Sequence, residues 1–425
     1  MQKRSVHIGI FGLGTVGSGI VELLREGTEK SKDYNFTLKK VVVRNLDKKR
    51  RVSVPPEILS SNPKSILDNP DIDTVVEVMG GIHPAQEIVL EALKKGKNVV
   101  TANKKLLARV GSKIFEKALQ NNCYLGIRAS NIASYRLIES LTSSPSKMGK
   151  LLGIFNGTCN YILTEMERKG EDFPIILKRA QEIGYAEPDP SDDIRGYDTA
   201  HKLIILLGLA LGYFIPLESL YVEGIERISY KDILFTKELG YRIKLLAIAK
   251  KFGDNLEARV HPALLPRNKG LARLGGIENG VEIEDEGGLG IRMQAPGAGK
   301  YPAAIAVMED LICIAKGRKL FLPQDKISLI LKPISEIQTK YYLRFTALDK
   351  AGVLAKIANV LGNHNISIEA VLQKGSGKEE VKWVPIIMLT HKSREKDIQS
   401  ALKQIDSLSV TKGSSLLIRV EEEIF

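Results

Sequence analysis

The chain has 425 residues, 44% of them hydrophobic and 26% charged, which is enough for two to four domains with ordinary buried cores. No run approaches the roughly 20 apolar residues of a membrane-spanning helix. The first residues lack a charged and then apolar leader, so we expect a cytoplasmic protein. The net charge of +12 is spread along the chain without interleaved aromatic residues, so nucleic acid is not the expected partner. The three cysteines and six histidines are scattered, a distribution that predicts neither disulfides nor a metal site.

The first 130 residues alternate short apolar runs with amphipathic helical patterns. Strand-like runs cover residues 6–12, 38–44, 74–78 and 98–101, and helical patterns cover residues 16–25 and 85–95. This alternation predicts a parallel sheet with helices on both faces. The fold class is therefore α/β in this part of the chain.

A glycine-rich sequence, GLGTVG, follows the first predicted strand and opens the first predicted helix. Gly12 permits the tight turn, Gly14 allows backbone to approach a pyrophosphate, and Gly17 lets the helix pack on the strand. We therefore predict a dinucleotide-binding domain over residues 1–130, completed by residues 300–325. The candidate cofactor residues of this turn are Gly12, Gly14, Thr15, Val16 and Gly17.

The end of the second predicted strand carries basic residues where a ribose-binding carboxylate is usual. Arg44 comes first, and residues 48–51 read KKRR. Cations at this place suit a 2′-phosphate, which favours NADP, with NAD as the alternative. A solvated basic loop without a ligand explains the same residues.

Residues 131–320 have a different pattern. Helical patterns cover residues 175–182, 198–211 and 232–251, and strand-like runs cover 256–261 and 281–284, which indicates an α+β domain. Asp198 and Lys202 lie one helical turn apart in a helix whose following residues are apolar. Burial of that helix would lower the pKa of Lys202 unless a carboxylate compensates, so this lysine is a candidate proton donor and acceptor. An ordinary helix salt bridge is the alternative.

The tail begins after a polar segment, residues 321–339, that we interpret as a linker. Residues 340–425 then follow a βαββαβ order, which is typical of a small ferredoxin-like domain. The strand and helix patterns cover residues 341–348, 352–362, 366–373, 384–389, 395–405 and 415–420.

Several short sequences, taken together and in order, resemble those of homoserine dehydrogenases. They are EVMGG at 77–81, TANK at 101–104, NGTCNYIL at 156–163, VEGIE at 222–226 and HPALLP at 261–266, with GYAEPDP at 184–190 and PGAG at 296–299. Residues 348–357 and 363–368 resemble the first loop and helix of an ACT domain. The resemblance covers nearly the whole chain and implies a Rossmann-type domain, a substrate and dimerisation domain over 131–320, and a C-terminal ACT domain.

The resemblance implies NAD(P)-dependent interconversion of L-homoserine and L-aspartate 4-semialdehyde in threonine, methionine and isoleucine biosynthesis. Lys104 and Lys202 would form the acid/base pair, and Asp198 would orient Lys202. General acid catalysis of this kind supplies roughly 10²- to 10⁴-fold. Glu187 and Asp193 would bind the amino and hydroxyl end of the substrate, and Thr158 and Tyr185 would add hydroxyl contacts. Further candidate cofactor residues are Gly80, Asn103, Lys104 and Gly299.

One stretch departs from the family pattern. Where the family has a Glu-Ala-Ser-Val sequence and a small-residue loop beside a monovalent cation, residues 128–136 read RASNIASYR. Arg128 would repel a cation, so we expect that ion site to be lost or rebuilt. Tyr135 and Arg136 would narrow the substrate pocket, or Arg136 would contact the substrate carboxylate.

In the tail, backbone amides at the first ACT loop and helix start are suited to an amino-acid carboxylate. The resemblance implies a homodimer or homotetramer inhibited by threonine, and a purely dimerising tail is the alternative. Because the chain opens at the dinucleotide motif, no fused kinase is expected. The candidate effector residues are Asp349, Gly352, Val353, Leu354 and Asn365.

Two other functions stay open. The departure over residues 128–136 is also compatible with an amino-acid-sensing regulatory protein that binds the cofactor without turnover. A dehydrogenase that acts on another small amino-acid aldehyde is the second alternative, and turnover with that aldehyde alone would identify it.

Overall fold

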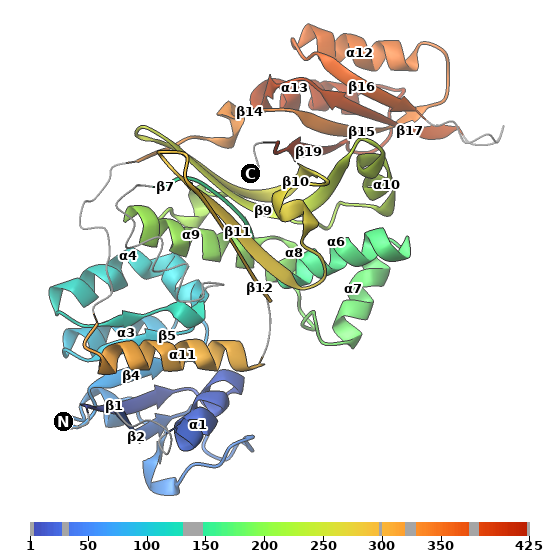
Figure 1. The fold of residues 1–425 in the computed structure, drawn as a ribbon. Helices are drawn as coiled ribbons and strands as arrows, with labels where there is room; N and C mark the ends of the chain where they lie inside the picture. Colours follow the sequence, from blue (N-terminus) through green and yellow to red (C-terminus); the bar gives the residue numbers. More distant parts are fainter. Residues whose placement is uncertain are drawn as a thin grey trace. The chain divides into compact units, whose positions relative to one another are not determined.

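The computed structural model describes residues 4–27, 34–130, 148–296, 300–318, 329–373 and 382–422 (Figure 1). The chain forms two compact units. The first comprises residues 1–148, 201–219 and 296–328, and the second comprises 149–200, 220–295 and 329–425. None of the helices in the described ranges is long and apolar enough to cross a membrane.

The first unit is built on a parallel sheet with the strand order β3-β2-β1-β4-β5-β6. Its order changes direction between β1 and β4, and in sheets of this kind ligands bind in the crevice at that point, beyond the carboxyl ends of the strands. The strands are β1 (Arg4–Phe11), β2 (Tyr34–Val42), β3 (Leu59–Ser60), β4 (Thr74–Glu77), β5 (Asn98–Thr101) and β6 (Leu125–Gly126).

Helices α1 (Thr15–Gly27) and α11 (Lys300–Ala315) pack on β1 and bury a shared apolar core. This core joins Ile20 and Leu24 of α1 to Val307 and Leu311 of α11 across Ile10 of β1. α11 thus belongs to the first unit although it is distant in sequence. The remaining helices of this sheet are α2 (Lys64–Leu67), α3 (Ala85–Lys94) and α4 (Lys104–Gln120).

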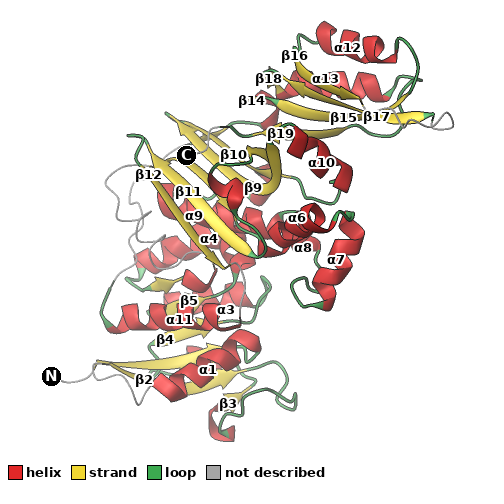
Figure 2. Ribbon diagram, turned by 45° about the vertical axis from the view of Figure 1, so that its right-hand side comes forward, coloured by secondary structure: helices red, strands yellow, loops and turns green. Residues whose placement is uncertain are grey.

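The second unit contains a long mixed sheet in the order β12-β11-β7-β9-β10-β19-β15-β17-β16, and β8 and β13 also pair with β10 (Figure 2). Its first half consists of β7 (Met148–Ile154), β8 (Tyr221–Val222), β9 (Tyr241–Phe252), β10 (Asn255–Pro266), β11 (Glu278–Asp285), β12 (Gly290–Pro296) and β13 (Ile330–Leu331). The helices of this part are α6 (Gly157–Lys169), α7 (Phe173–Glu182), α8 (Ser191–Ile194), α9 (Tyr197–Leu211) and α10 (Tyr230–Glu238). The chain passes from the second unit to the first within α9.

The helix predicted over residues 232–251 is present only in its first part, and the prediction was wrong for residues 241–251, which form a strand. The helix is α10, which begins with a capping box between Ser229 and Asp232 and ends before Gly240, whose φ is +84°. The following residues form β9, which pairs with β10 along its length and with β7 on its other side. A continuous apolar run has no clear periodicity, so pairing with neighbours decides between helix and strand.

The C-terminal part has the βαββαβ order that the sequence predicts. Helices α12 (Val353–Asn363) and α13 (Glu395–Asp406) lie together over its strands and share a core with them (Figure 1). Its strands are β14 (Gln338–Thr339), β15 (Tyr341–Leu348), β16 (Ile368–Gln373), β17 (Trp383–Thr390), β18 (Ser393–Arg394) and β19 (Leu416–Val420). β19 also pairs with β10, so the two parts of this unit share one sheet.

Candidate active site

A cavity of about 730 Å³ opens at the carboxyl ends of β1 and β4. The glycine-rich turn forms one side of it, and Arg44 with residues 48–51 forms another. Gly80 and His83, from the loop after β4, complete the lining. Of the predicted cofactor residues of the turn, Gly12, Gly14 and Thr15 line this cavity together with the basic loop, whereas Val16 and Gly17 are not among its lining residues.

The three glycines of the turn have different surroundings. Gly12 has a φ of +103°, and a Cβ there would lie 2.8 Å from the carbonyl oxygen of Val78. A Cβ on Gly17 would lie 2.2 Å from the carbonyl oxygen of Gly12. A Cβ on Gly14 would have no atom within 4 Å, so this glycine alone borders open space. This arrangement fits a dinucleotide whose pyrophosphate approaches the backbone at Gly14 and the start of α1.

The basic loop has one residue that shapes it and others that remain exposed. The Arg50 guanidinium donates hydrogen bonds to the backbone carbonyls of Asn45, Leu46 and Lys48. Arg44 and Arg51 are exposed. None of the described residues that line the cavity is acidic, so the space has a positive potential.

A buried carboxylate joins the loops that follow β4 and β5. Glu77 is fully buried; it accepts the backbone N–H of Met79 at 2.8 Å and the hydroxyl of Thr101 at 2.6 Å. The Thr101 hydroxyl in turn accepts the N–H of Asn103. The Asn103 side chain caps α4 by accepting the N–H of Leu106 and donates to the carbonyl of Gly81. Glu77 was not among the predicted site residues, although a charged residue ending a buried strand is a signal for such a role.

The two predicted acid/base lysines belong to the first unit. Lys104 is the first residue of α4, directly after the capping Asn103, and is half-buried. Lys202 lies on α9 and is 7% exposed. The burial expected for Lys202 is therefore present.

The predicted substrate carboxylates Glu187 and Asp193 belong to the second unit together with Asp198, and an amide links Asp193 to Asp198. Asn156 caps α6, and its Nδ2 donates to Asp193 at 2.6 Å and to Asp198 at 3.1 Å. Asn156 was not among the predicted site residues, since nothing in the sequence shows that Asp193 and Asp198 face it. The Thr158 hydroxyl donates to the carbonyl of Tyr185.

The other two predicted contacts are more open to solvent. Glu187 is exposed and lies in the loop between α7 and α8. The Tyr185 ring is 43% exposed and packs edge-on against Tyr161. Both side chains are thus accessible to a small molecule.

Arg128 is buried in the first unit and paired. Its guanidinium contacts the carboxylate of Asp310 and the hydroxyl of Tyr124, and its backbone N–H donates to Asp310 at 3.0 Å. Burial raises the pKa of Asp310 to about 6 against the opposing effect of Arg128. Because Asp310 neutralises the Arg128 charge, repulsion between like charges no longer argues against a bound cation. That the ion site is lost or rebuilt stays a prediction. Residues 131–136 and Gly299 lie outside the described residues.

Four of the predicted effector residues lie at the start of α12, and the fifth, Asn365, follows its end. Gly352 adopts a φ of +82° at the N-cap of this helix, where no side chain caps the first N–H groups. Leu354 is 38% exposed and Val353 is buried. Asn365, beyond the end of the helix, has a φ of +58°. The Asp349 carboxylate is exposed and accepts a long contact of 3.5 Å from Gln373.

The parallel sheet, the glycine-rich turn and the C-terminal domain define a nicotinamide-dinucleotide-dependent oxidoreductase with an appended ACT domain. Family models agree: residues 12–127 match the NAD-binding domain of homoserine dehydrogenase, residues 135–312 match homoserine dehydrogenase, and residues 341–410 match the ACT domain.

Known proteins resemble the chain over its length. It is 39% identical to a homoserine dehydrogenase of Helicobacter pylori, over 99% of this chain and 100% of that one, and 38% identical to one of Synechocystis sp., over 98% and 99%. The crystal structure of a homoserine dehydrogenase from Thiobacillus denitrificans matches with a TM-score of 0.90 at 36% identity, covering 99% of this chain and 100% of that chain. The chain belongs to the homoserine dehydrogenase family.

Proposed function

We propose that the chain interconverts L-homoserine and L-aspartate 4-semialdehyde with Lys202 and Lys104 as the acid/base pair. The observation that carries this proposal is the Asn156 amide, which holds Asp193 and Asp198 beside each other at the start of the helix that bears Lys202. The substrate has an ammonium group, so the Asp193 carboxylate at that place offers a complementary charge, while Asp198 lies on the same helix as Lys202.

Each residue has a distinct part in this proposal. A bound nicotinamide would supply or accept the hydride at the aldehyde carbon. Lys202 gives a proton to the developing alkoxide or removes it in the reverse direction, and Asp198 orients it. Because Lys202 is only 7% exposed, bulk water has little access to its side chain and competes little with the substrate for the proton. Asp193 and Glu187 bind the amino and hydroxyl end of the substrate, and Thr158 and Tyr185 add hydroxyl contacts.

Lysine substitution tests the catalytic roles. Lys202→Ala is expected to lower kcat for NADP-dependent homoserine oxidation by at least about 100-fold, and Lys169→Ala, at the exposed end of α6, serves as the matched control. NADPH binding by the wild-type protein without turnover would favour the regulatory alternative. Turnover of a different amino-acid aldehyde alone would favour the altered dehydrogenase.

The proposed cofactor is NADP, with NAD as the weaker alternative. The support is the basic loop, with Arg44 and Arg51 exposed at a cavity without acidic lining among its described residues. Arg44→Ala is expected to raise KM for NADPH about tenfold and to leave KM for NADH nearly unchanged, since only NADPH carries the 2′-phosphate. Lys113→Ala, at an exposed position of α4, is the control, and equal changes for both cofactors would contradict the preference.

Regulation, assembly and location are proposed on the family resemblance. Threonine would bind at Asp349, Gly352–Leu354 and Asn365 and inhibit a homodimer or homotetramer in the cytoplasm. The support for the effector is the ACT match together with uncapped N–H groups at the start of α12. The proposed domains are 1–130 with 300–325 for the cofactor, 131–320 for substrate and dimerisation, 321–339 as linker and 340–425 for regulation.

A further inference from the structure

A second cavity, of about 390 Å³, lies within the second unit, between the C-terminal domain and the segment that follows β8. Three segments far apart in sequence line it, residues 221–227, 399–406 and 414–419. None of these residues belongs to the candidate active site or to the effector loop at the start of α12. The volume lies at the lower end of the roughly 300–1,000 Å³ of small-molecule pockets.

The buried guanidinium of Arg419 forms the floor of the cavity, and carboxylates and an aromatic ring contact it. Arg419 is 2% exposed; it donates to both carboxylate oxygens of Glu395 at 3.0 and 2.6 Å and to Glu223 at 3.0 Å. It also lies 4.7 Å from the ring centre of Tyr221, whose hydroxyl donates to Glu223. This floor is ordered before any ligand arrives, so binding has little ordering cost there.

Charged side chains of both signs surround Arg419, and each of them can make further hydrogen bonds. Lys403 and Arg227 are exposed, and neither has a carboxylate partner among the described residues. Arg227 donates one hydrogen bond, to the carbonyl of Ser415. Asp406 uses Oδ1 for the N–H and hydroxyl of Ser415, and Glu223 uses Oε2 for Arg419 and Tyr221. The second oxygen of each carboxylate has no hydrogen-bond donor in the described structure.

We propose that this cavity binds a small zwitterion, an α-amino acid, at a site separate from the effector loop. The ligand carboxylate would lie between Lys403 and Arg227, and its ammonium would face Glu223 and Asp406. Charge-assisted hydrogen bonds at both ends account for the mixed lining better than a simple anion does, since a simple anion would be repelled by the two carboxylates.

Such a ligand would contact the ACT domain and the segment after β8 at once. Lys403 and Asp406 come from α13, whereas Glu223 and Arg227 come from that segment. Because the ligand binds only when these parts are together, it stabilises their association by mass action. The site thus goes beyond the proposed dehydrogenase function and would add a second amino-acid signal to the same domain.

The test uses the full chain and each of the twenty standard L-amino acids as probes in isothermal titration calorimetry. At least one is expected to bind, with Kd raised about tenfold or more in Lys403→Gln and in Arg227→Gln. Lys396→Gln, an exposed lysine of α13 outside the cavity, and Asn365→Ala, a proposed effector residue that follows α12, are expected to leave that Kd unchanged. Dehydrogenase turnover without added amino acid is expected to be the same in the wild type and in the Lys403→Gln, Arg227→Gln and Lys396→Gln variants. Failure of this binding proposal is therefore distinguishable from failure of the proposed dehydrogenase function.

Removing one charge from the ligand tests its class. The ethyl ester of the amino acid that binds, and the matching acid without the amino group, are each expected to bind at least about tenfold more weakly. The proposal is overturned if no amino acid binds, if Asn365→Ala removes all binding while Lys403→Gln and Arg227→Gln bind normally, or if the amine-free acid binds as tightly as the amino acid.

Discussion

At the scale of single residues, the Glu77 carboxylate connects the loop that follows β4 with the turn that precedes Lys104. It holds the backbone after β4 through Met79 and the turn before α4 through Thr101. In Glu77→Gln the side chain keeps one acceptor oxygen, so one of these donors loses its partner at a cost of about 1–3 kcal/mol.

We expect Glu77→Gln to raise KM for NADPH and lower kcat, each roughly tenfold, because both loops shift. Steady-state kinetics with homoserine and with NADP varied in turn would measure this. Glu91→Gln, on the outer surface of α3, is the control. Unchanged kinetics in a folded Glu77→Gln protein would show that the carboxylate does not position the site.

Lys244 on β9 makes stability depend on pH. It is 2% exposed, and its Nζ donates to the neutral acceptors Asn160 Oδ1 and Leu274 O. Burial, with a smaller effect of Arg242, lowers the pKa of Lys244 from 10.5 to about 7. Between these values the unfolded chain binds the proton and the folded chain does not, so stability rises with pH through this window.

We expect the free energy of unfolding to rise, relative to Lys244→Met, by on the order of 4 kcal/mol between pH 7 and pH 10. Urea denaturation at several pH values would measure the two slopes. Lys237→Met, an exposed lysine of α10, should keep the wild-type slope. A Lys244→Met protein with the same slope as wild type would mean that Lys244 remains charged in the fold.

At the scale of elements, different glycines of the glycine-rich turn allow the packing of α1 on β1 and the approach of a ligand to the backbone. A Cβ at Gly17 overlaps the Gly12 carbonyl and pushes α1 off β1, whereas a Cβ at Gly14 meets open space. We expect Gly17→Ala to cost about 1–3 kcal/mol of stability. Gly14→Ala is expected to leave the Tm nearly unchanged and to raise KM for NADPH at least about tenfold.

Thermal unfolding and steady-state kinetics on the same two proteins provide the comparison, each variant serving as the control for the other. If Gly14→Ala bound NADPH normally, the open side of the turn would not be where the pyrophosphate lies. The sequence motif predicts both roles, and the structure shows which atoms lie next to each glycine.

The error over residues 241–251 shows why secondary structure could not be predicted from this part of the sequence alone. Residues 241–249 are apolar or basic without a helical or alternating period, so their preference is weak on its own. Pairing with β10 on one side and β7 on the other buries them as a central strand. By contrast, the start of α10 is determined by neighbouring residues, because Ser229 and Asp232 form a capping box.

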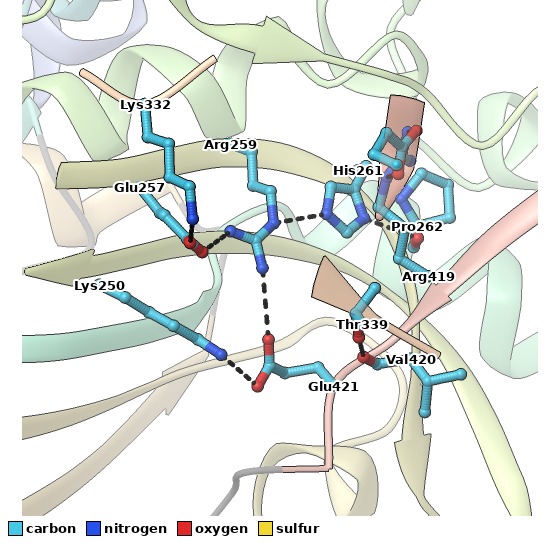
Figure 3. A network of polar contacts seen from close by, with 11 residues as sticks. Lys250, Glu257, Arg259, His261, Pro262, Lys332, Thr339, Arg419, Val420 and Glu421 are labelled. Atoms are coloured by element: carbon cyan, nitrogen blue, oxygen red, sulfur yellow. Dashed lines mark hydrogen bonds and ion pairs between the residues drawn. The ribbon is translucent and has the colours of Figure 1, made fainter. Parts of the chain in front are cut away.

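At the scale of the whole molecule, buried ion pairs join the ACT domain to the sheet of the second unit. Glu421, just after β19, pairs with Lys250 at 2.8 Å and with Arg259 at 3.6 Å, as Figure 3 shows. Arg419 on β19 pairs with Glu223 of the first half of the unit and with Glu395 of α13. These contacts accompany the backbone pairing of β19 with β10.

We expect Arg419→Met to destabilise the second unit by about 3–5 kcal/mol, because it leaves buried carboxylates without a partner. Differential scanning calorimetry should then show the ACT domain unfolding in a separate, earlier transition. Arg394→Met, which breaks the exposed pair with Glu336, should cost less than about 1 kcal/mol. A single transition at the wild-type temperature in Arg419→Met would exclude this role.

The α/β class, the dinucleotide turn, the family and the βαββαβ tail could be predicted from the sequence, because they depend on local periodicity and on short motifs whose neighbours in sequence are neighbours in space. Only the tertiary structure decided that Asn156 bridges Asp193 and Asp198, that Asp310 neutralises Arg128, and that Arg419 joins three segments. Each of these contacts spans more than twenty residues of chain, and such pairings follow from how helices and strands pack rather than from the residues beside them.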